Sequence, residues 1–185
     1  TTTTTTTRSP TKKSGRWLGL RMLVAPRSAP PPHFGVRARA LVGAYAYSVL
    51  AGTQGRRNHY KQDRLYELAN RFRLPLVLFS EGGGGRPGDD NNGPRVAFDT
   101  HTFTQFSKLS GLVPLVGVNN GRCFAGNTAL LACCDVIIAT ESSTIAMGGP
   151  AMIEGGGLGV YTPEEVGPMS FQVPNGVVDI LAKDE

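Results

Sequence analysis

The sequence has few of the residues and patterns on which metal, membrane and nucleotide-binding functions depend. Among its 185 residues are three cysteines and three histidines, without the CxxC or Cys/His spacing of a metal site. There is no run of about 18 apolar residues, so we expect no segment that spans a membrane. The GxxxxGK[ST] pattern of a phosphate-binding loop is also missing. These absences argue against all three classes.

The three cysteines are Cys123, Cys133 and Cys134, an odd number with two of them adjacent in an apolar stretch. Unpaired cysteines of this kind behave as small core hydrophobes and are typical of a reducing compartment. We therefore predict a cytoplasmic protein without a disulfide framework.

The net charge of +5 raises the possibility of a nucleic-acid partner, but its distribution argues against one. The basic surplus lies mostly within residues 1–73, and no basic motif with interleaved aromatic residues is present. We expect no nucleic-acid binding.

Residues 1–33 begin with seven threonines, contain a proline-rich segment and lack acidic residues. This composition predicts a disordered leader. A likeness to an organelle transit peptide and a truncated or poorly translated 5′ end are open alternatives. Residues 34–185 are long and apolar enough for one globular domain, which is also compatible with half of a larger protein.

Hydrophobic patterning predicts strands that alternate with helices, and hence an α/β domain. Residues 65, 68, 69 and 72 share one face of a helix predicted over Lys61–Phe72. A further helix is expected over Phe98–Leu109, after a loop at Asp89–Pro94. The predicted strands are one or two in Ala40–Leu50, then Leu74–Phe79, Leu115–Val118, Val136–Thr140, Thr144–Met147 and Val177–Leu181.

The centre of the chain has the form of a βαβ unit, which requires a parallel sheet. A corner at Cys123–Asn127 joins one strand to an apolar helix predicted over Thr128–Cys134. Amides at the start of a helix lack intrahelical acceptors, and Gly126 allows a ligand to approach the main chain. The corner is therefore a candidate oxyanion hole.

Four consecutive glycines, Gly82–Gly85, follow the predicted strand Leu74–Phe79. The carboxyl edge of a parallel sheet is where ligands bind in α/β proteins. Pro87 argues against a dinucleotide-binding turn, which opens directly into a helix. A flexible loop without a ligand is the alternative. Downstream, residues 148–157 form a second glycine-dense loop, and Thr162–Glu165 has the form of a capping box.

Several separated motifs resemble one known family. The sequences EGGGGR (81–86), NGRCFAGNTALLACCDVIIAT (120–140) and residues 146–179 look like the N-terminal half of the carboxyltransferase component of biotin-dependent acyl-CoA carboxylases. Residues 47–69 are similar too, so the resemblance covers about residues 40–185. It implies the crotonase/ClpP-like fold, a superhelix of ββα units.

The resemblance also implies a site in which backbone amides hold the thioester carbonyl of an acyl-CoA. By motif, one donor is Gly85 with Gly84 beside it, and the other is Gly126 with Ala125 beside it. Such a site stabilises an enolate without a side-chain base, and one donor is typically worth roughly 3 kcal/mol of barrier. Further residues expected to contact substrate are Gly52, Thr53, Gln54, Gly55, Arg56, Arg86 and Phe124.

The implied cofactor is biotin on a partner carrier domain, with acyl-CoA as the substrate. The implied partners are the biotin carboxyl carrier and biotin carboxylase components, a second carboxyltransferase half, and further copies of the chain in a homo-oligomer. The acyl group is left open, since it depends on the shape of the pocket.

Three other interpretations of the sequence are open. A truncated, non-catalytic CoA-binding or assembly module is the main one. A hydratase or isomerase of the same superfamily needs a poised carboxylate, for which Glu154, Glu164 and Glu165 are available. A protease needs Ser or Lys at the corner, where Ala125 and Gly126 stand instead.

Overall fold

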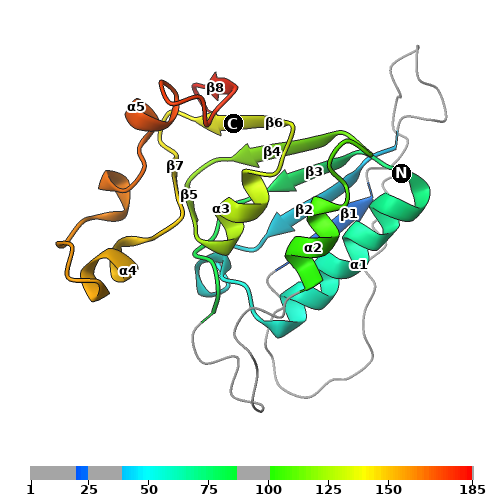
Figure 1. Cartoon of the computed structure of the whole chain (residues 1–185), viewed down its shortest axis with the longest axis horizontal. Coiled ribbons are helices and arrows are strands. Elements are labelled where there is room, and N and C mark those ends of the chain that lie inside the picture. Colours follow the sequence, from blue (N-terminus) through cyan, green and yellow to red (C-terminus); the bar gives the residue numbers. More distant parts are fainter. Residues whose placement is uncertain (1–19, 25–38, 87–100, 185) are drawn as a thin grey trace.

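The fold is described from a computed structural model, for residues 20–24, 39–86 and 101–184. Its main element is a six-stranded sheet with the order β1-β2-β3-β4-β6-β8 (Figure 1). All neighbouring pairs are parallel except β1 with β2, which is antiparallel. The strands are β1 (Leu20–Val24), β2 (Leu41–Tyr45), β3 (Leu76–Phe79), β4 (Leu115–Asn119), β6 (Val136–Thr140) and β8 (Ile180–Ala182).

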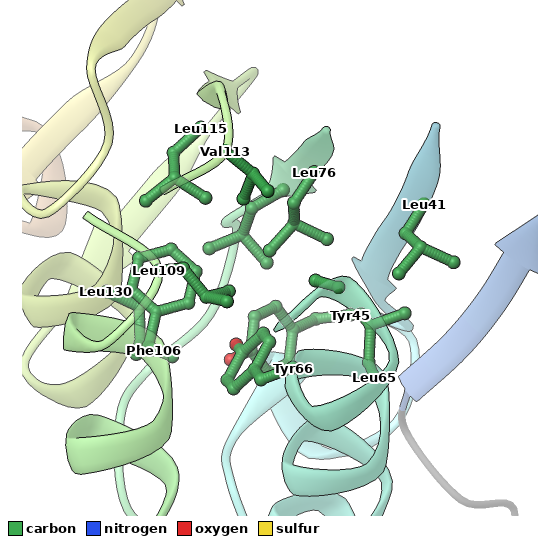
Figure 2. Packing of buried hydrophobic residues seen from close by; sticks show 12 residues of the cluster. Leu41, Tyr45, Leu65, Tyr66, Leu76, Phe106, Leu109, Val113, Leu115 and Leu130 are labelled. Carbon is green, nitrogen blue, oxygen red and sulfur yellow. The ribbon is translucent and has the colours of Figure 1, made fainter. Parts of the chain in front are cut away.

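Three helices lie along one face of this sheet (Figure 1): α1 (Arg56–Phe72), α2 (His101–Ser107) and α3 (Gly126–Leu131). Alternate strand residues such as Leu41, Leu76 and Leu115 face them and are about 1% exposed. Figure 2 shows this core, in which Tyr66 of α1 meets Phe106 of α2 edge to face at 4.9 Å between ring centroids. Burial of this apolar layer is what holds the helices on the sheet.

A second, shorter set of strand pairings runs beside the carboxyl ends of the main strands. It contains β5 (Arg122–Phe124), which pairs in parallel with β7 (Thr144–Ala146). Isolated bridges extend it: Gln54 pairs with Gly85, and Gly82 pairs with Cys123. We call Gln54, Gly82–Gly85, β5 and β7 the short stack. Each main strand from β2 to β6 is thus followed by an extended piece of the short stack and then by a helix.

Beyond β7 the chain runs out of the layered part to α4 (Figure 1). It returns beside β7 at Gly167 and Pro168, where the Ile145 N–H donates to the Gly167 carbonyl at 2.9 Å, before it reaches β8. This segment contains α4 (Pro150–Gly155), a 3₁₀ helix (Pro163–Glu165) and α5 (Met169–Gln172). The predicted capping box is present, since both the Thr162 and the Glu165 side chains bond the turn. The prediction of a loop over residues 148–157 is wrong at α4, where Pro150 stands at a helix start, a favoured position for proline.

The α/β class and the repeating strand, extended piece and helix confirm the predicted architecture. Boundaries differ at several elements. Helix α1 begins at Arg56, five residues earlier than the predicted Lys61, because its first turns bury polar side chains at Asn58 and Gln62. Helix α3 ends at Leu131, and α5 was not predicted. The last strand begins at Ile180 instead of Val177.

Strand β1 lies within residues 1–33, which we expect to be disordered, and so corrects that prediction for residues 20–24. Its sequence, LRMLV, contains four apolar residues and pairs along its whole length with β2. The rest of the predicted leader, the Asp89–Pro94 loop and the first residues of the Phe98–Leu109 helix lie outside the described residues. The division into a leader and one domain stays a prediction.

The backbone at Ala125, between β5 and α3, is unusual. Its φ of 53° and ψ of −122° lie in a region that glycine adopts readily and that a Cβ atom disfavours. Conformations of this kind cost roughly 1–3 kcal/mol and persist where surrounding contacts impose them. Here the Ala125 N–H donates to the Ala146 carbonyl at 3.1 Å, which ties the corner to β7.

We predict that Gly117→Ala lowers the free energy of unfolding by about 1–3 kcal/mol. A Cβ atom on Gly117 would lie 2.3 Å from Cδ1 of Leu131, a fully buried side chain of α3. Thermal and urea unfolding measure the effect. Gly155→Ala is the control, because a Cβ there meets nothing within 4 Å. Equal stabilities of the two variants would contradict the close packing of α3 on β4.

We predict that Ala125→Gly raises the free energy of unfolding by about 1 kcal/mol, since the positive φ no longer strains a Cβ. The control is Ala129→Gly inside α3, where the same change costs about 1 kcal/mol of helix stability. Chemical denaturation of both variants tests this. Loss of stability in Ala125→Gly as large as in the control would show that the corner is not strained.

Candidate functional site

The glycine loop Gly82–Gly85 and the corner after β5 meet through main-chain hydrogen bonds. The Gly82 N–H donates to the Arg122 carbonyl at 2.9 Å, and the Phe124 N–H donates to the Gly82 carbonyl at 2.8 Å. These bonds form because the short stack continues strand pairing beyond the ends of β3 and β4. They place the loop directly against the corner, as the sequence predicts.

The contact is close enough to require glycine at Gly84. A Cβ atom there would lie 2.5 Å from the Ala125 Cβ and 3.2 Å from the Gly126 nitrogen. The φ of Gly84 is +82°, which also favours glycine. The two segments proposed from sequence to carry donor amides are therefore in van der Waals contact.

The residues beside the two expected donors, Gly84 and Ala125, use their amides inside the protein. The Gly84 N–H donates to Oδ1 of Asn127 at 3.0 Å, and the Ala125 N–H donates to the Ala146 carbonyl. A buried N–H that already has a good acceptor gains little by turning to a ligand. Gly84 and Ala125 thus hold the shape of the site.

The amides of Gly85 and Gly126 donate to no acceptor within the described residues. Gly85 bridges Gln54 through the neighbouring bonds, Gln54 N–H to Gly84 carbonyl and Arg86 N–H to Gln54 carbonyl, so its own N–H points away from Gln54. Gly126 is the first residue of α3, whose N–H has no intrahelical acceptor. We call these two N–H groups the amide pair.

The main chain at Gly85 is not crowded by side chains of the described residues, whereas the main chain at Gly126 is. A Cβ on Gly85 would meet nothing within 4 Å. A Cβ on Gly126 would lie 3.2 Å from Oε1 of Gln54 and 3.3 Å from Cζ of Phe103. Gln54 is 3% exposed and donates from Nε2 to the Tyr45 hydroxyl at 2.9 Å. Gln54 and Phe103 therefore form walls beside Gly126.

The other predicted substrate contacts from the Gly52–Gly55 turn form the support of the glycine loop. A Cβ on Gly52 would lie 2.6 Å from the Glu81 carbonyl oxygen. The Arg86 guanidinium donates from Nη2 to the Thr53 carbonyl at 2.8 Å and from Nε to its hydroxyl at 3.2 Å. Gly55 is the residue before α1 and accepts the N–H of Asn58.

The side chains of two residues expected to contact substrate, Arg56 and Phe124, have neighbours outside the glycine loop. The Arg56 guanidinium is on the exposed start of α1, 5.8 Å from the centre of the Tyr60 ring. The Phe124 side chain is 7% exposed and lies beside Gly149, so little of it is accessible to a ligand.

Sequence reasoning missed Asn127 and Phe103. Asn127 is fully buried and bonds both Gly84 and the Ser80 carbonyl. The sequence does show an asparagine directly after Gly126. Asparagine is common at helix starts, so its presence there does not indicate a role in the site. Phe103 was predicted only as an apolar residue of a covering helix.

Two titrating side chains that lie in or beside the short stack, Cys123 and Tyr45, are neutral at neutral pH. Burial raises the pKa of the Cys123 thiol to about 11, and this thiol lies 3.3 Å from the Ser80 carbonyl. Burial also raises the pKa of Tyr45 far above its usual value. Both groups are therefore neutral. The arrangement suits a ligand that accepts hydrogen bonds from the main chain.

The carboxylates considered for a hydratase or isomerase have other partners. Glu164 accepts from Nε of Arg122 at 3.0 Å, and this hydrogen bond lowers the pKa of Glu164. Glu165 accepts from the Thr162 N–H at 2.7 Å, which lowers its pKa as well. Glu154 is exposed on α4. Two of the three are thus committed to local structure.

A separate hollow of about 980 Å³ is lined by the side chains of the sheet that alternate with those facing the helices. Its lining is mostly apolar and includes Ala44, Phe79, Val118, Ile138 and Ala182. In the described ranges, no group of three or more His, Cys, Asp or Glu side chains has the geometry of a metal site. None of the helices described here has the length and apolar character needed to cross a membrane.

Comparison with known proteins supplies a family. The model for the carboxyl transferase domain matches residues 37–185. The chain is 30% identical over 129 residues to the mitochondrial methylcrotonoyl-CoA carboxylase β chain of Dictyostelium discoideum, covering 68% of this chain and 22% of the relative. It is 26% identical over 151 residues to the acetyl-CoA carboxylase carboxyl transferase subunit β of Protochlamydia amoebophila, covering 77% and 46%.

Solved structures agree. A single-chain, multi-domain long-chain acyl-CoA carboxylase is 55% identical, with a TM-score of 0.79 over 90% of this chain and 16% of that chain. The transcarboxylase 12S structure, described as a hexamer with methylmalonyl-CoA bound, has a TM-score of 0.71 at 22% identity and shows the shared fold.

The chain spans less than half the length of each of these relatives. The family model nevertheless covers every described element from β2 to β8. With the crotonase-like fold and the order of the motifs, this shows that the chain belongs to the carboxyl transferase domain family of biotin-dependent acyl-CoA carboxylases.

Proposed function

We propose that this chain supplies the acyl-CoA half of a carboxyltransferase site, in which the amide pair of Gly85 and Gly126 binds the thioester carbonyl oxygen. The observation that carries the proposal is that both N–H groups lack an acceptor in the described part of the chain, although they lie in segments that touch. Family membership adds the chemistry that such donors serve.

The reaction transfers a carboxyl group to the α-carbon of the acyl-CoA. The α C–H bond breaks, its electron pair forms the enolate, and the enolate carbon forms a new C–C bond to CO2. Carboxybiotin, when bound, supplies the CO2 and a ureido nitrogen that accepts the α-proton. Donors aimed at the enolate oxygen stabilise it more than the neutral thioester, which is how a preorganised amide pair accelerates the step.

The residues present fit a reaction in which the cofactor accepts the proton and the protein stabilises the enolate oxygen. The open side of Gly85 leaves the main chain accessible to a substrate. Gln54 and Phe103 restrict the approach to Gly126 and so limit the orientations of a carbonyl there. The protein contributes polar main-chain groups and shape, and no side chain of this chain is assigned the role of base.

The remainder of the site is proposed to come from partners. These are a second carboxyltransferase half, the biotin carboxyl carrier and biotin carboxylase components, and further copies of the chain in a homo-oligomer. The segment between β7 and β8 supports a large partner surface, because five of its apolar side chains are more than half exposed. Such exposed side chains are Met147, Met152, Leu158, Val160 and Phe171. A contiguous apolar surface is typical of a protein interface.

A calorimetric titration of the full chain tests the binding step. Acetyl-CoA and propionyl-CoA are compared with free CoA and with a thioether analogue, S-ethyl-CoA, which lacks the carbonyl. We expect the thioesters to bind about tenfold more tightly than the thioether, because one or two hydrogen bonds to the carbonyl are lost. Equal affinities for thioester and thioether would contradict the amide pair as a carbonyl site.

We predict that Gly126→Asp abolishes enolate-forming activity while affinity for free CoA stays within a few fold. The carboxylate would stand beside the position of the enolate oxygen, where a second negative charge is strongly unfavourable. Carboxyl transfer is measured in the complete carboxylase assembly. Gly111→Asp is the control, since a Cβ there meets nothing and Asp tolerates a positive φ. Unchanged turnover in Gly126→Asp would exclude the corner from the reaction.

A further inference from the structure

Asn127, a residue of α3, connects the glycine loop to the corner on the buried side of both segments. Its side chain is fully buried. Oδ1 accepts the Gly84 N–H at 3.0 Å, and Nδ2 donates to the Ser80 carbonyl at 3.2 Å. One partner is a donor and the other an acceptor, so the orientation of the carboxamide is fixed by its surroundings.

Few side chains could make both bonds. Asp lacks the donor for Ser80, and Ser is too short to bond both groups. The space is also limited, because a Cβ on Gly82 would lie 2.2 Å from Nδ2 of Asn127. Asparagine in this position of the fold therefore requires glycine at position 82.

The geometry points to a role for Asn127 as the positioning residue of the amide pair, and we propose this role here. It rests on the proposed function. Asn127 directly follows Gly126, and the amide it holds, that of Gly84, directly precedes Gly85. Gly126 is thus next to Asn127 in the chain, and Gly85 is next to the residue whose N–H the Asn127 carboxamide accepts. By engaging the Gly84 N–H, Asn127 also leaves Gly85 as the accessible donor of the loop.

This role differs from simple core packing in what it predicts for a ligand. A packing residue affects the stability of the fold and weakens all CoA compounds together. A positioning residue determines whether two N–H groups converge on one oxygen, so its loss affects ligands with a carbonyl and spares those without one. The ratio of thioester to thioether affinity separates the two roles.

The test is the isosteric variant Asn127→Asp, titrated as the full chain with acetyl-CoA, S-ethyl-CoA and free CoA. The carboxylate places an oxygen against the Ser80 carbonyl in place of a donor and displaces the loop. We expect the thioester preference of the unmodified chain to fall about tenfold, with free CoA affinity nearly unchanged. Asn119→Asp is the matched control, because Asn119 is equally buried and, like Asn127, bonds Ser80, but accepts from its hydroxyl at 3.1 Å; its Nδ2 donates to the Gly121 carbonyl, and it has no bond to Gly84.

The outcomes are distinct. If the unmodified chain shows no thioester preference, the proposed function fails and the role of Asn127 fails with it. If that preference exists and persists in Asn127→Asp, the positioning role alone is overturned. An equal loss in Asn119→Asp also overturns it, since any buried charge would then suffice.

A measurement on the unmodified chain covers the case in which Asn127→Asp does not fold. Amide hydrogen exchange followed by NMR should find Gly84 protected with and without ligand, because Asn127 accepts its N–H. Gly85 and Gly126 should exchange rapidly in the free chain and slow when acetyl-CoA binds. Exchange of Gly84 as fast as that of Gly85 would overturn the proposal.

Discussion

The pairing of Gly82 with β5 is the contact on which the rest of the site depends. Parallel strands of the main sheet bring their carboxyl ends about 4.8 Å apart, and their loops would ordinarily diverge from there. The two hydrogen bonds between Gly82 and the Arg122–Phe124 backbone prevent this. They continue the strand pairing beyond the end of the main sheet and place the glycine loop in contact with the corner. Glycine at positions 82 and 84 is the steric condition for it.

The same arrangement recurs along the chain, which explains how the fold produces a site from main-chain atoms. After β2 comes Gln54, after β3 the glycine loop, after β4 the strand β5, and after β6 the strand β7. Successive units stack these pieces side by side. Several of their amides bond one another, and within the described residues a donor remains at a piece that turns into a helix and at one that faces away from its neighbour. Gly126 and Gly85 are such positions.

Much of the fold could be predicted from sequence because the signals are local. The run LVLF is apolar throughout, and VIIAT is apolar up to Thr140 and rich in β-branched residues, so these short runs indicate strands of a parallel sheet. The capping box at Thr162 depends on residues three apart. Strand β1 was missed because its five residues lie in a leader of low complexity, and its pairing with β2 is not visible in its own composition.

The resemblance implies Gly85 and Gly126 as the donors, with Gly84 and Ala125 beside them, but residue types alone do not supply the reason. Gly84 and Gly85 are identical in chemistry, and so their roles cannot be separated without the partners of each amide. The structure assigns Asn127 to Gly84 and Ala146 to Ala125, contacts between residues 43 and 21 positions apart. Likewise the sequence predicts Arg86 as a substrate contact, and the structure adds two hydrogen bonds from its guanidinium to Thr53. Long-range bonds of this kind decide which groups remain for a substrate.

We propose that two main-chain donors, the N–H groups of Gly85 and Gly126, polarise a thioester carbonyl. The most direct measurement is the infrared spectrum of acetyl-CoA labelled with 13C at the carbonyl, recorded free in water and bound to the full chain. We predict a carbonyl stretch at lower frequency in the bound state than in water, because two fixed N–H groups replace mobile water. A bound frequency equal to or above that in water would contradict it.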